Sequence, residues 1–342
     1  MITVQDRIEV RGADLPRLRG MITERYRPGA EARGLRFVEE CISPPLRLAE
    51  QPNVLWLRWT LPDAAAFWAM RFQSADPAVA AFWRELDGFV LSRERQFLVE
   101  AERDLPAPED VTQFLATPTT WRETAQLFLR DGQGDDARAA FESTLARAAQ
   151  LPTLITAALA RNLVPQHGAG HYTWDLVYPD RASAEAARGT DLWQQVLHPA
   201  VQRACRSVAA LGLGTIGAGQ RAAGLANGIK RTALFRLLPG IDRMRQLRWE
   251  QDTLAMAAHI PSIRNWRLSR AEALAWDASD VAPWSYVWEQ EYATLEGLNV
   301  DYMIHPHHWA FVDRAFDPES GAQIIDTALC HAFCPLVESL IL

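Results

Sequence analysis

Residues 284–316 read WSYVWEQEYATLEGLNVDYMIHPHHWAFVDRAF: an aromatic extended segment, a short helical segment, and a proline that opens an amphipathic helix. The same order occurs at 54–86, VLWLRWTLPDAAAFWAMRFQSADPAVAAFWREL, and at 171–208, HYTWDLVYPDRASAEAARGTDLWQQVLHPAVQRACRSV. Proline is favoured at the first helical position because its missing N–H has no helical partner there. The prolines that predict helix starts are Pro77, Pro199 and Pro306. The chain therefore contains three repeats.

Each repeat also contains a strand, a helix and a second strand ahead of this block, and a last strand after it. In the third repeat these are 230–238, 241–259 and 263–274, with 323–333 at the end; the counterparts are 121–130, 136–150 and 154–164 in the second repeat and 2–11, 15–26 and 35–43 in the first. The resulting order is βαββαβ, the ferredoxin-like pattern with two helices on one face of a four-stranded antiparallel sheet. We expect an α+β fold of three tandem ferredoxin-like units, at 1–105, 118–220 and 228–342.

The pairing of these units follows from the uncovered face of each sheet. Two such faces can pack together into an α/β barrel, so two units can pair within the chain and the third needs a partner chain. We therefore expect a homodimer. The boundaries are predicted in 104–120, which contains several prolines, and in the Gly/Ala-rich stretch 212–228, which is interpreted as a flexible connector.

The composition restricts the partners and the compartment. The 342 residues include 35 basic and 42 acidic side chains, net −7, which would repel a phosphate backbone, so we expect no nucleic acid partner. Four scattered cysteines suit a reducing compartment, and no stretch approaches the roughly 20 apolar residues of a membrane span. We expect a cytoplasmic protein without a membrane partner. Lys230 is the only lysine, so a Schiff base would have to form there.

The string DYMIHPHHWAF at 301–311, with a strand before it and QIID after the next helix, resembles the stress-responsive dimeric α/β-barrel family. The resemblance covers about residues 228–342 and implies a barrel whose members include cofactor-free polyketide cyclases. In the cyclase motif a tyrosine orients the substrate and a histidine is the general base, which correspond to Tyr302 and His308. An aspartate on the last strand of the cyclase corresponds to Asp326. No cofactor is implied.

Two positions depart from the cyclase pattern. Arg231 and Tyr286 stand where the cyclase has a first-strand and a third-strand histidine. A guanidinium at Arg231 suits a carboxylate or phenolate on the substrate, which cyclisation of a neutral polyketide does not require. This difference favours a lyase over a cyclase. The alternative for Arg231 is a solvated or ion-paired strand end.

The residues themselves suggest compatible chemistry. His308 would lie in the first turn of the helix opened by Pro306, where the helix dipole disfavours a cation and keeps imidazole neutral as a base. Asp326 on the last strand could hold the other ring nitrogen, as the carboxylate of a catalytic triad does. The alternative is a capping or core histidine.

Alternation on the strand near 284–292 predicts one almost wholly aromatic face. Its members are Trp284, Tyr286, Trp288, Gln290 and Tyr292, with Ser285, Val287, Glu289 and Glu291 on the other face. Together with Trp309 and His305, this face could line a dry pocket for a small hydrophobic aromatic substrate. The alternative is that these rings only fill the barrel.

Three weaker patterns suggest metal or nucleotide sites. His305, His307 and His308 could bind a metal, but 307 points away from the helix face shared by the other two. Cys330 and Cys334 are separated by roughly 13 Å along a strand, too far for one ion or one disulfide. The stretch 212–217, GLGTIG, matches a dinucleotide fingerprint but follows a helical run instead of a strand. We therefore predict neither a metal nor a cofactor.

The leading hypothesis is a cofactor-independent lyase in which His308, assisted by Tyr302 and Asp326, removes a proton from a phenolic or polyketide-like substrate and so drives C–C cleavage or decarboxylation. The alternatives are a polyketide cyclase of the same fold and a non-catalytic ligand-binding or stress-response barrel.

Overall fold

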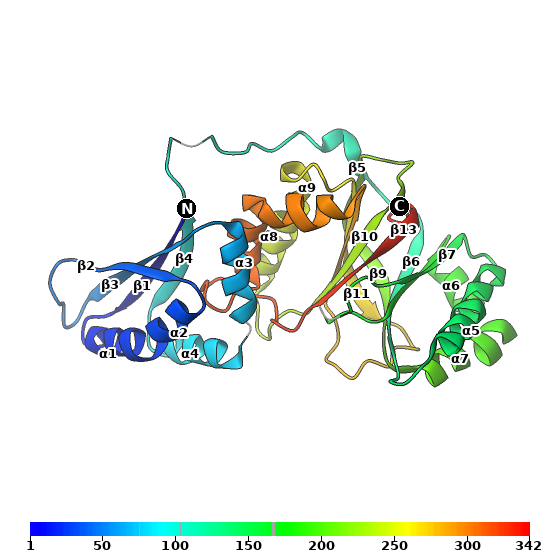
Figure 1. Cartoon of the computed structure of the whole chain (residues 1–342), viewed down its shortest axis with the longest axis horizontal. Coiled ribbons are helices and arrows are strands. Elements are labelled where there is room, and N and C mark those ends of the chain that lie inside the picture. Colours follow the sequence, from blue (N-terminus) through cyan, green and yellow to red (C-terminus); the bar gives the residue numbers. More distant parts are fainter. Residues whose placement is uncertain (75, 103, 166–167) are drawn as a thin grey trace. The chain divides into compact units, whose positions relative to one another are not determined.

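The computed structural model describes residues 1–342 except 75, 103, 166 and 167. It forms two compact units. The first unit contains Met1–Ala107 and Met303–Thr327, and the second contains Pro108–Tyr302 and Ala328–Leu342. The chain therefore returns to the first unit late in the sequence before it completes the second. Figure 1 colours the chain along its sequence.

The first unit contains one ferredoxin-like repeat with antiparallel strands in the order β2-β3-β1-β4. In β1, residues alternate between buried and half-buried, because one face of the sheet packs on the helices and the other does not. The strands are β1 (Ile2–Arg11), β2 (Arg36–Ser43), β3 (Pro52–Leu61) and β4 (Ser92–Leu98), and the helical segments are α1 (Leu15–Met21), η1 (Ile22–Tyr26), α2 (Arg27–Ala32), α3 (Ala64–Gln73) and α4 (Pro77–Asp87).

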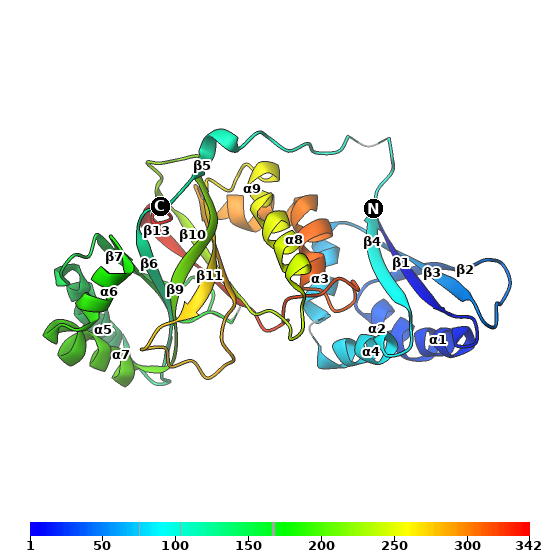
Figure 2. The same ribbon diagram turned by 180° about the vertical axis from the view of Figure 1, so that it is seen from behind.

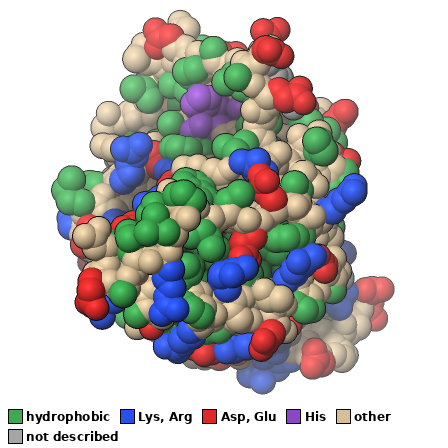
Figure 3. Space-filling model, turned by 90° about the vertical axis from the view of Figure 1, so that its left-hand side faces the viewer, with side chains coloured by type: hydrophobic (Ala, Val, Ile, Leu, Met, Phe, Trp, Pro, Cys, Tyr) green, Lys and Arg blue, Asp and Glu red, His purple; other side chains and the backbone are tan. Residues whose placement is uncertain are grey.

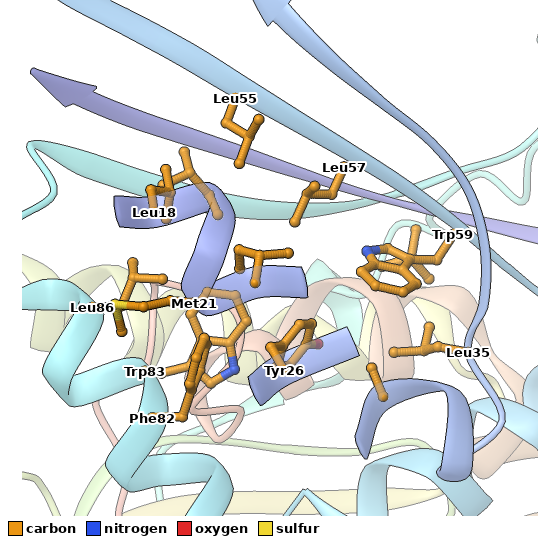
Figure 4. Packing of buried hydrophobic residues seen from close by; sticks show 14 of the residues in the cluster. Leu18, Met21, Tyr26, Leu35, Leu55, Leu57, Trp59, Phe82, Trp83 and Leu86 are labelled. Carbon is orange, nitrogen blue, oxygen red and sulfur yellow. The ribbon is translucent and has the colours of Figure 1, made fainter. Parts of the chain in front are cut away.

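The core of this unit lies between β3 and the helices. Figure 4 shows Leu55, Leu57 and Trp59 of β3 facing Tyr26 and Trp83 from the helices. Burying such large apolar side chains is the main favourable term in folding, about 25 cal/mol per Å² of apolar surface. The predicted helix start at Pro77 is confirmed, because the Asp76 carboxylate caps α4 by accepting the N–H of Ala78 at 2.8 Å.

Residues 303–327 pack with the first unit, although the sequence pattern places them in the third repeat. They contain η6 (His307–Val312) and η7 (Asp313–Ala315). Asp313 accepts a hydrogen bond from Arg71 of α3 at 2.7 Å. Glu319 is fully buried and accepts from Tyr26 at 2.8 Å and Arg95 at 2.8 Å. Buried ion pairs thus fix this segment to the unit.

The second unit contains the other two repeats. Its strands are β5 (Leu115–Ala116), β6 (Trp121–Leu129), β7 (Thr156–Arg161), β8 (Tyr172–Tyr178), β9 (Cys205–Gln220), β10 (Ala226–Phe235), β11 (Asn265–Ala273), β12 (Tyr286–Tyr292) and β13 (Cys330–Glu338). Its helical segments are η2 (Thr112–Phe114), α5 (Asp135–Ala146), η3 (Arg147–Gln150), α6 (Arg181–Arg188), η4 (Leu192–Leu197), α7 (His198–Ala204), α8 (Arg243–Leu254), α9 (Met256–His259) and η5 (Gly297–Tyr302).

One sheet runs through both repeats in the order β13-β10-β12-β11-β9-β6-β8-β7, with β5 beside β9. Each half has the ferredoxin-like order, and Figure 2 shows the halves joined through β9 and β11. At the other seam the N–H of Leu163 donates to the carbonyl of Phe333 at 2.9 Å, so the sheet is nearly closed into a barrel. The predicted α+β fold of ferredoxin-like units is confirmed.

The barrel interior contains charged side chains from both repeats. Arg122 on β6 donates to Glu289 on β12 at 2.9 Å, and Lys230 on β10 donates to Asp175 on β8 at 2.8 Å. Burial raises the pKa of Glu289, but Arg122 and Lys230 outweigh it and lower that pKa to about 2. Arg267 lies in the same interior and donates to backbone carbonyls. These ion pairs hold one repeat against the other.

The glycine-rich stretch is not a flexible connector, because residues 205–220 form the long strand β9. Its glycines allow large side chains to approach the backbone: a β-carbon at Gly212 would lie 2.6 Å from the Trp121 ring, and one at Gly219 would overlap the Trp266 ring. The helix start predicted at Pro199 is also wrong, since η4 continues directly into α7 and His198 is already helical.

Two features are relevant to binding partners: the charge distribution on the surface and the length and composition of the helices. On the face in Figure 3, basic and acidic side chains are interspersed. Among the described residues, no helix combines the length and the apolar composition that a membrane crossing requires.

Candidate functional site

A buried polar cluster lies on the outward face of β10, β12 and β13. It comprises Arg231, Gln290, Tyr292, Tyr302 and His331, and is called the Arg231 cluster below. The register pairs Arg231 with Gln290, and the guanidinium donates from Nη1 to Gln290 Oε1 at 2.6 Å. The guanidinium carbon lies 5.3 Å from the centre of the Tyr302 ring, within cation–π distance.

The charge of Arg231 is not balanced locally. The side chain is only 5% exposed, yet within the described residues no carboxylate lies within ion-pair distance of it. Arg95 and Arg122 are also buried, and each forms hydrogen bonds with two carboxylates. The guanidinium contacts one amide oxygen, a phenol ring and, at 3.5 Å, a histidine nitrogen, so it bears most of its desolvation cost without a counter-ion. This position suits an external anion.

His331 was missed by the sequence analysis, which treated Cys330 to Cys334 only as a thiol pair. On β13 the cysteines are buried and burial raises the pKa of both thiols to about 12, whereas His331 lies on the opposite face. Its Nδ1 is 3.5 Å from Nη2 of Arg231. A guanidinium can only donate, so a hydrogen bond between the two side chains requires Nδ1 as the acceptor. Strand alternation alone could have placed His331 beside Arg231.

His308 lies in the first unit, at the start of η6. Its side chain is 9% exposed, and its ring is tilted against that of Trp68 with centroids 5.0 Å apart. The His308 N–H donates to the carbonyl of His305 at 2.9 Å, so the chain re-enters helix here as the Pro306 pattern predicts. His305 is half-buried, and its Nδ1 accepts the N–H of His307 at 3.2 Å.

Tyr302 and Asp326 are placed in different units. Tyr302 ends η5 in the second unit, is 2% exposed, and packs edge-on against Tyr292 with centroids 6.0 Å apart. Asp326 is half-buried in the first unit. It is not on the last strand as expected, because β13 begins only at Cys330. Burial raises the pKa of Tyr292 well above its usual value, so this phenol stays neutral.

The alternation predicted for the third-repeat strand is confirmed for β12. Residues 286, 288, 290 and 292 share the face of Arg231, while Glu289 and Glu291 face the barrel interior. Tyr286 packs 4.7 Å from the Trp249 ring and donates to Glu250 of α8 at 2.7 Å. Its phenol is therefore held by the helix that covers this face. Trp288 is 1% exposed, and its indole N–H has no hydrogen-bond partner in the described part of the chain.

Two predicted aromatic site residues pack elsewhere. Trp284 precedes β12 and packs on the apolar cluster that includes Leu213 and Val287, with the Arg236 guanidinium 4.5 Å above its ring. Trp309 belongs to the hydrophobic core of the first unit, where its indole N–H donates to the Ile304 carbonyl at 3.0 Å. Both contacts are those of core side chains.

Among residues 1–342 apart from the four that are not described, no group of three or more His, Cys, Asp or Glu side chains is arranged to hold an ion.

Comparisons with known proteins find solved structures that are similar in fold, but they do not assign the chain to a family. No family model matches the chain, and no curated protein matches it. An anthrone oxidase-like protein has a TM-score of 0.47 and 9% identity over 65% of this chain and 92% of its own. A mutant chlorite dismutase from Candidatus Nitrospira defluvii has a TM-score of 0.37 and 7% identity over 66% and 95%. An uncharacterized NIPSNAP domain protein from Burkholderia xenovorans has a TM-score of 0.25 and 19% identity over 31% and 99%.

Proposed function

We propose that this chain binds a hydrophobic aromatic compound carrying a carboxylate or phenolate, with the anionic oxygen on Arg231, and acts on it as a cofactor-independent lyase. The observation that carries the proposal is the buried guanidinium of Arg231 without a carboxylate among the described residues. An anionic ligand would supply charge-assisted hydrogen bonds, which are about twice as strong as neutral ones.

The surroundings of Arg231 favour an aromatic ligand. Tyr302, Tyr292 and Trp288 present rings on the same face as the guanidinium, and rings stack or pack edge-on with planar ligands. The unpartnered indole N–H of Trp288 would gain an acceptor if a ligand oxygen reached it. The proposed substrate is therefore phenolic or polyketide-like, with one anionic group.

The proposed reaction begins with proton removal by His308. The base takes a proton from a phenol or from carbon beside a carbonyl. For decarboxylation, the bond between the ring and the carboxylate then breaks, the carboxylate leaves as carbon dioxide, the bonding electron pair stays on the ring carbon, and the protonated histidine donates its proton to that carbon. General-base assistance contributes about 10²–10⁴ in rate. His308 is buried, with its ring against that of Trp68. Tyr302 and Asp326 are the proposed assisting groups.

The test uses the purified full chain, a library of phenolic and polyketide-like acids, and no added cofactor. We expect consumption of one member with a cleaved or decarboxylated product, and a loss of at least 100-fold in kcat for His308→Ala with binding retained. The control is His198→Ala, a histidine of α7 outside the cluster. Unchanged turnover in a folded His308→Ala variant would exclude the general-base role, and a ring-closed product would identify a cyclase.

Non-catalytic binding is the second candidate. It requires only the Arg231 cluster, which lies within the second unit. In this case Arg231 would bind the same aromatic anion, and no library member would be consumed.

The proposal includes a homodimer formed through the uncovered face of the first-unit sheet. Arg58 of this face pairs with Glu39 at 2.5 Å and both are nearly half exposed. In the first-unit sheet, Arg58 pairs with Gln5 across β3 and β1. In the barrel, Asp175 pairs with Thr124 across β8 and β6, the corresponding strands of the second repeat, and there this face is buried. Mixed charge makes the face self-complementary for two-fold pairing. Light scattering should give twice the chain mass, reduced by Arg58→Glu; a monomeric wild-type chain would contradict the pairing.

A further inference from the structure

The two repeats of the barrel share a Tyr–Glu–Arg arrangement. In the second repeat the Tyr172 hydroxyl donates to Glu142 of α5 at 2.6 Å, and Arg161 of β7 donates to the same oxygen at 2.5 Å. In the third repeat the corresponding distances are both 2.7 Å, between Tyr286, Arg270 and Glu250. The register is also the same, since each arginine lies opposite its tyrosine. The third repeat therefore serves as an internal comparison for the second.

Next to this arrangement the second repeat contains a hollow of about 450 Å³ between α5 and strands β7 and β8. Volumes of about 300–1,000 Å³ are typical of small-molecule sites. The hollow is lined by Glu142, Leu145, Ala146, Ala157, Leu159, Arg161, Tyr172 and Trp174. Its lining thus combines half-buried apolar side chains with the Tyr–Glu–Arg arrangement on one side.

Two small side chains account for this space. Ala157 on β7 lies opposite Leu176, as Trp266 on β11 lies opposite Gln290 at the matching position of the third repeat. Ala146 is the last residue of α5, and Leu254 is the last residue of the equally long α8. The third repeat thus carries tryptophan and leucine where the second carries two alanines. The two alanines thus leave a hollow at the surface that a ligand could fill.

The lining determines the chemistry of this ligand. The half-buried side chains of Ala157 and Leu159 supply the apolar part of the lining that a ligand can reach. Arg161 is 63% exposed and uses Nε for Glu142, which leaves its two Nη groups as donors to a further acceptor. Burial, and then the neighbouring Glu142, raise the pKa of Tyr172 to about 12, so its hydroxyl remains a neutral donor to Glu142.

We infer that this hollow is a second ligand site, which takes a flat aromatic molecule bearing one hydrogen-bond acceptor oxygen. The rings lie over Ala157 and Leu159, and the oxygen accepts from Arg161. The site is separate from the Arg231 cluster and does not depend on the proposed lyase activity.

The test is calorimetric titration of the full chain with 2-naphthoate and with 2-acetylnaphthalene. We expect saturable binding below about 1 mM, weakened at least tenfold by Ala157→Trp, which restores the residue type of the third repeat. Ala146→Leu provides a second, milder blocking variant at an exposed helix end, and it should weaken binding in the same direction. Arg161→Gln should weaken naphthoate binding by about tenfold. Tighter binding of naphthoate than of the ketone assigns the oxygen to a carboxylate, and equal binding assigns it to a neutral carbonyl.

Arg231→Met separates the two sites. Binding that persists in Arg231→Met and is lost in Ala157→Trp supports the second site. Binding that is unchanged in both Ala157→Trp and Ala146→Leu overturns the inference, as does the absence of binding by the wild-type chain up to 1 mM. Unchanged binding in the two alanine variants leaves the proposal for Arg231 unaffected, whereas a wild-type chain that does not bind 2-naphthoate also counts against naphthoate binding at Arg231.

Discussion

Lys230 donates to both carboxylate oxygens of Asp175, at 2.9 and 2.8 Å, across the interior of the barrel. The only lysine of the chain is therefore a structural cation that joins the second repeat to the third. Its Nζ also lies 2.9 Å from Glu289. A lysine held by two carboxylates is not available as a nucleophile, because these partners raise its pKa despite the burial that would lower it.

Lys230→Met should destabilise the second unit. Without Lys230, Arg122 is the one cation among the described residues that still hydrogen-bonds Asp175 and Glu289. Two buried carboxylates then share a single positive charge, so one negative charge is left unbalanced. Breaking a buried ion pair on one side costs about 3–5 kcal/mol. Urea unfolding of the variant measures this loss. The control is Arg248→Met, since Arg248 is largely exposed and pairs with Asp252 on the same helix; its effect should be below about 1 kcal/mol. Equal effects would contradict the structural role of Lys230.

The stability of the first unit should depend on pH through two buried carboxyls. Burial, reinforced by Glu319 and opposed by Arg71, raises the pKa of Asp317 from 3.8 to about 6. The folded state therefore binds a proton at Asp317 more tightly than the unfolded state does. The stability that this proton contributes is lost as the pH rises from about 4 through 6. Arg95 and Arg33 outweigh burial and lower the pKa of Glu319 from 4.5 to about 2, so its contribution is lost as the pH falls below about 4.5.

Asp317→Asn should remove the loss of first-unit stability at high pH. Its side-chain oxygen can still accept the Glu319 N–H, as Asp317 does at 3.0 Å. A pKa shift of this size corresponds to an order of 3 kcal/mol, so the variant should be more stable than the wild type at pH 8 and equal to it near pH 4. Unfolding by urea at both pH values is the measurement. A variant less stable than the wild type at pH 8 would show that the ionised carboxylate stabilises the fold.

Much of the fold could be predicted from the sequence, because local patterns set it. The alternation of Trp288 and Glu289 identified the two faces of β12, and Asp76 with Pro77 identified a helix start. The sequence could not tell which face lies inside the barrel, since both faces are buried. The interior is lined by Glu289 with its cations, and the aromatic face lies outward.

The candidate site was harder to predict because it depends on long-range packing. Trp309 belongs to an amphipathic helix that could pack on any apolar surface, and its partners Phe67 and Phe97 lie in the first unit. His308 therefore falls in that unit as well. Arg231 was predicted as a substrate residue, but only the structure shows that it is buried without a carboxylate among the described residues.

Strand β9 provides a matched pair of glycine substitutions. Gly219→Ala would bring a methyl group into the Trp266 ring, whereas a β-carbon at Gly214 lies 3.8 Å from its nearest neighbour, an ordinary contact. Overpacking typically costs about 1–3 kcal/mol. We expect Gly219→Ala to lower the free energy of unfolding by that amount, and Gly214→Ala to change it little. Equal effects of the two substitutions would mean that the glycines serve backbone conformation instead of close packing.

The most direct test of the account is the thermal stability of Arg231→Met with and without an aromatic acid. An uncompensated buried cation makes the free protein less stable than it could be, so replacing it with an apolar side chain of similar length should leave the melting temperature unchanged or higher. The stabilisation by 2-naphthoate attributable to this site should disappear. A variant that is destabilised by about 3–5 kcal/mol and still responds to 2-naphthoate as the wild type does would contradict the assignment of Arg231 as the anion-binding residue.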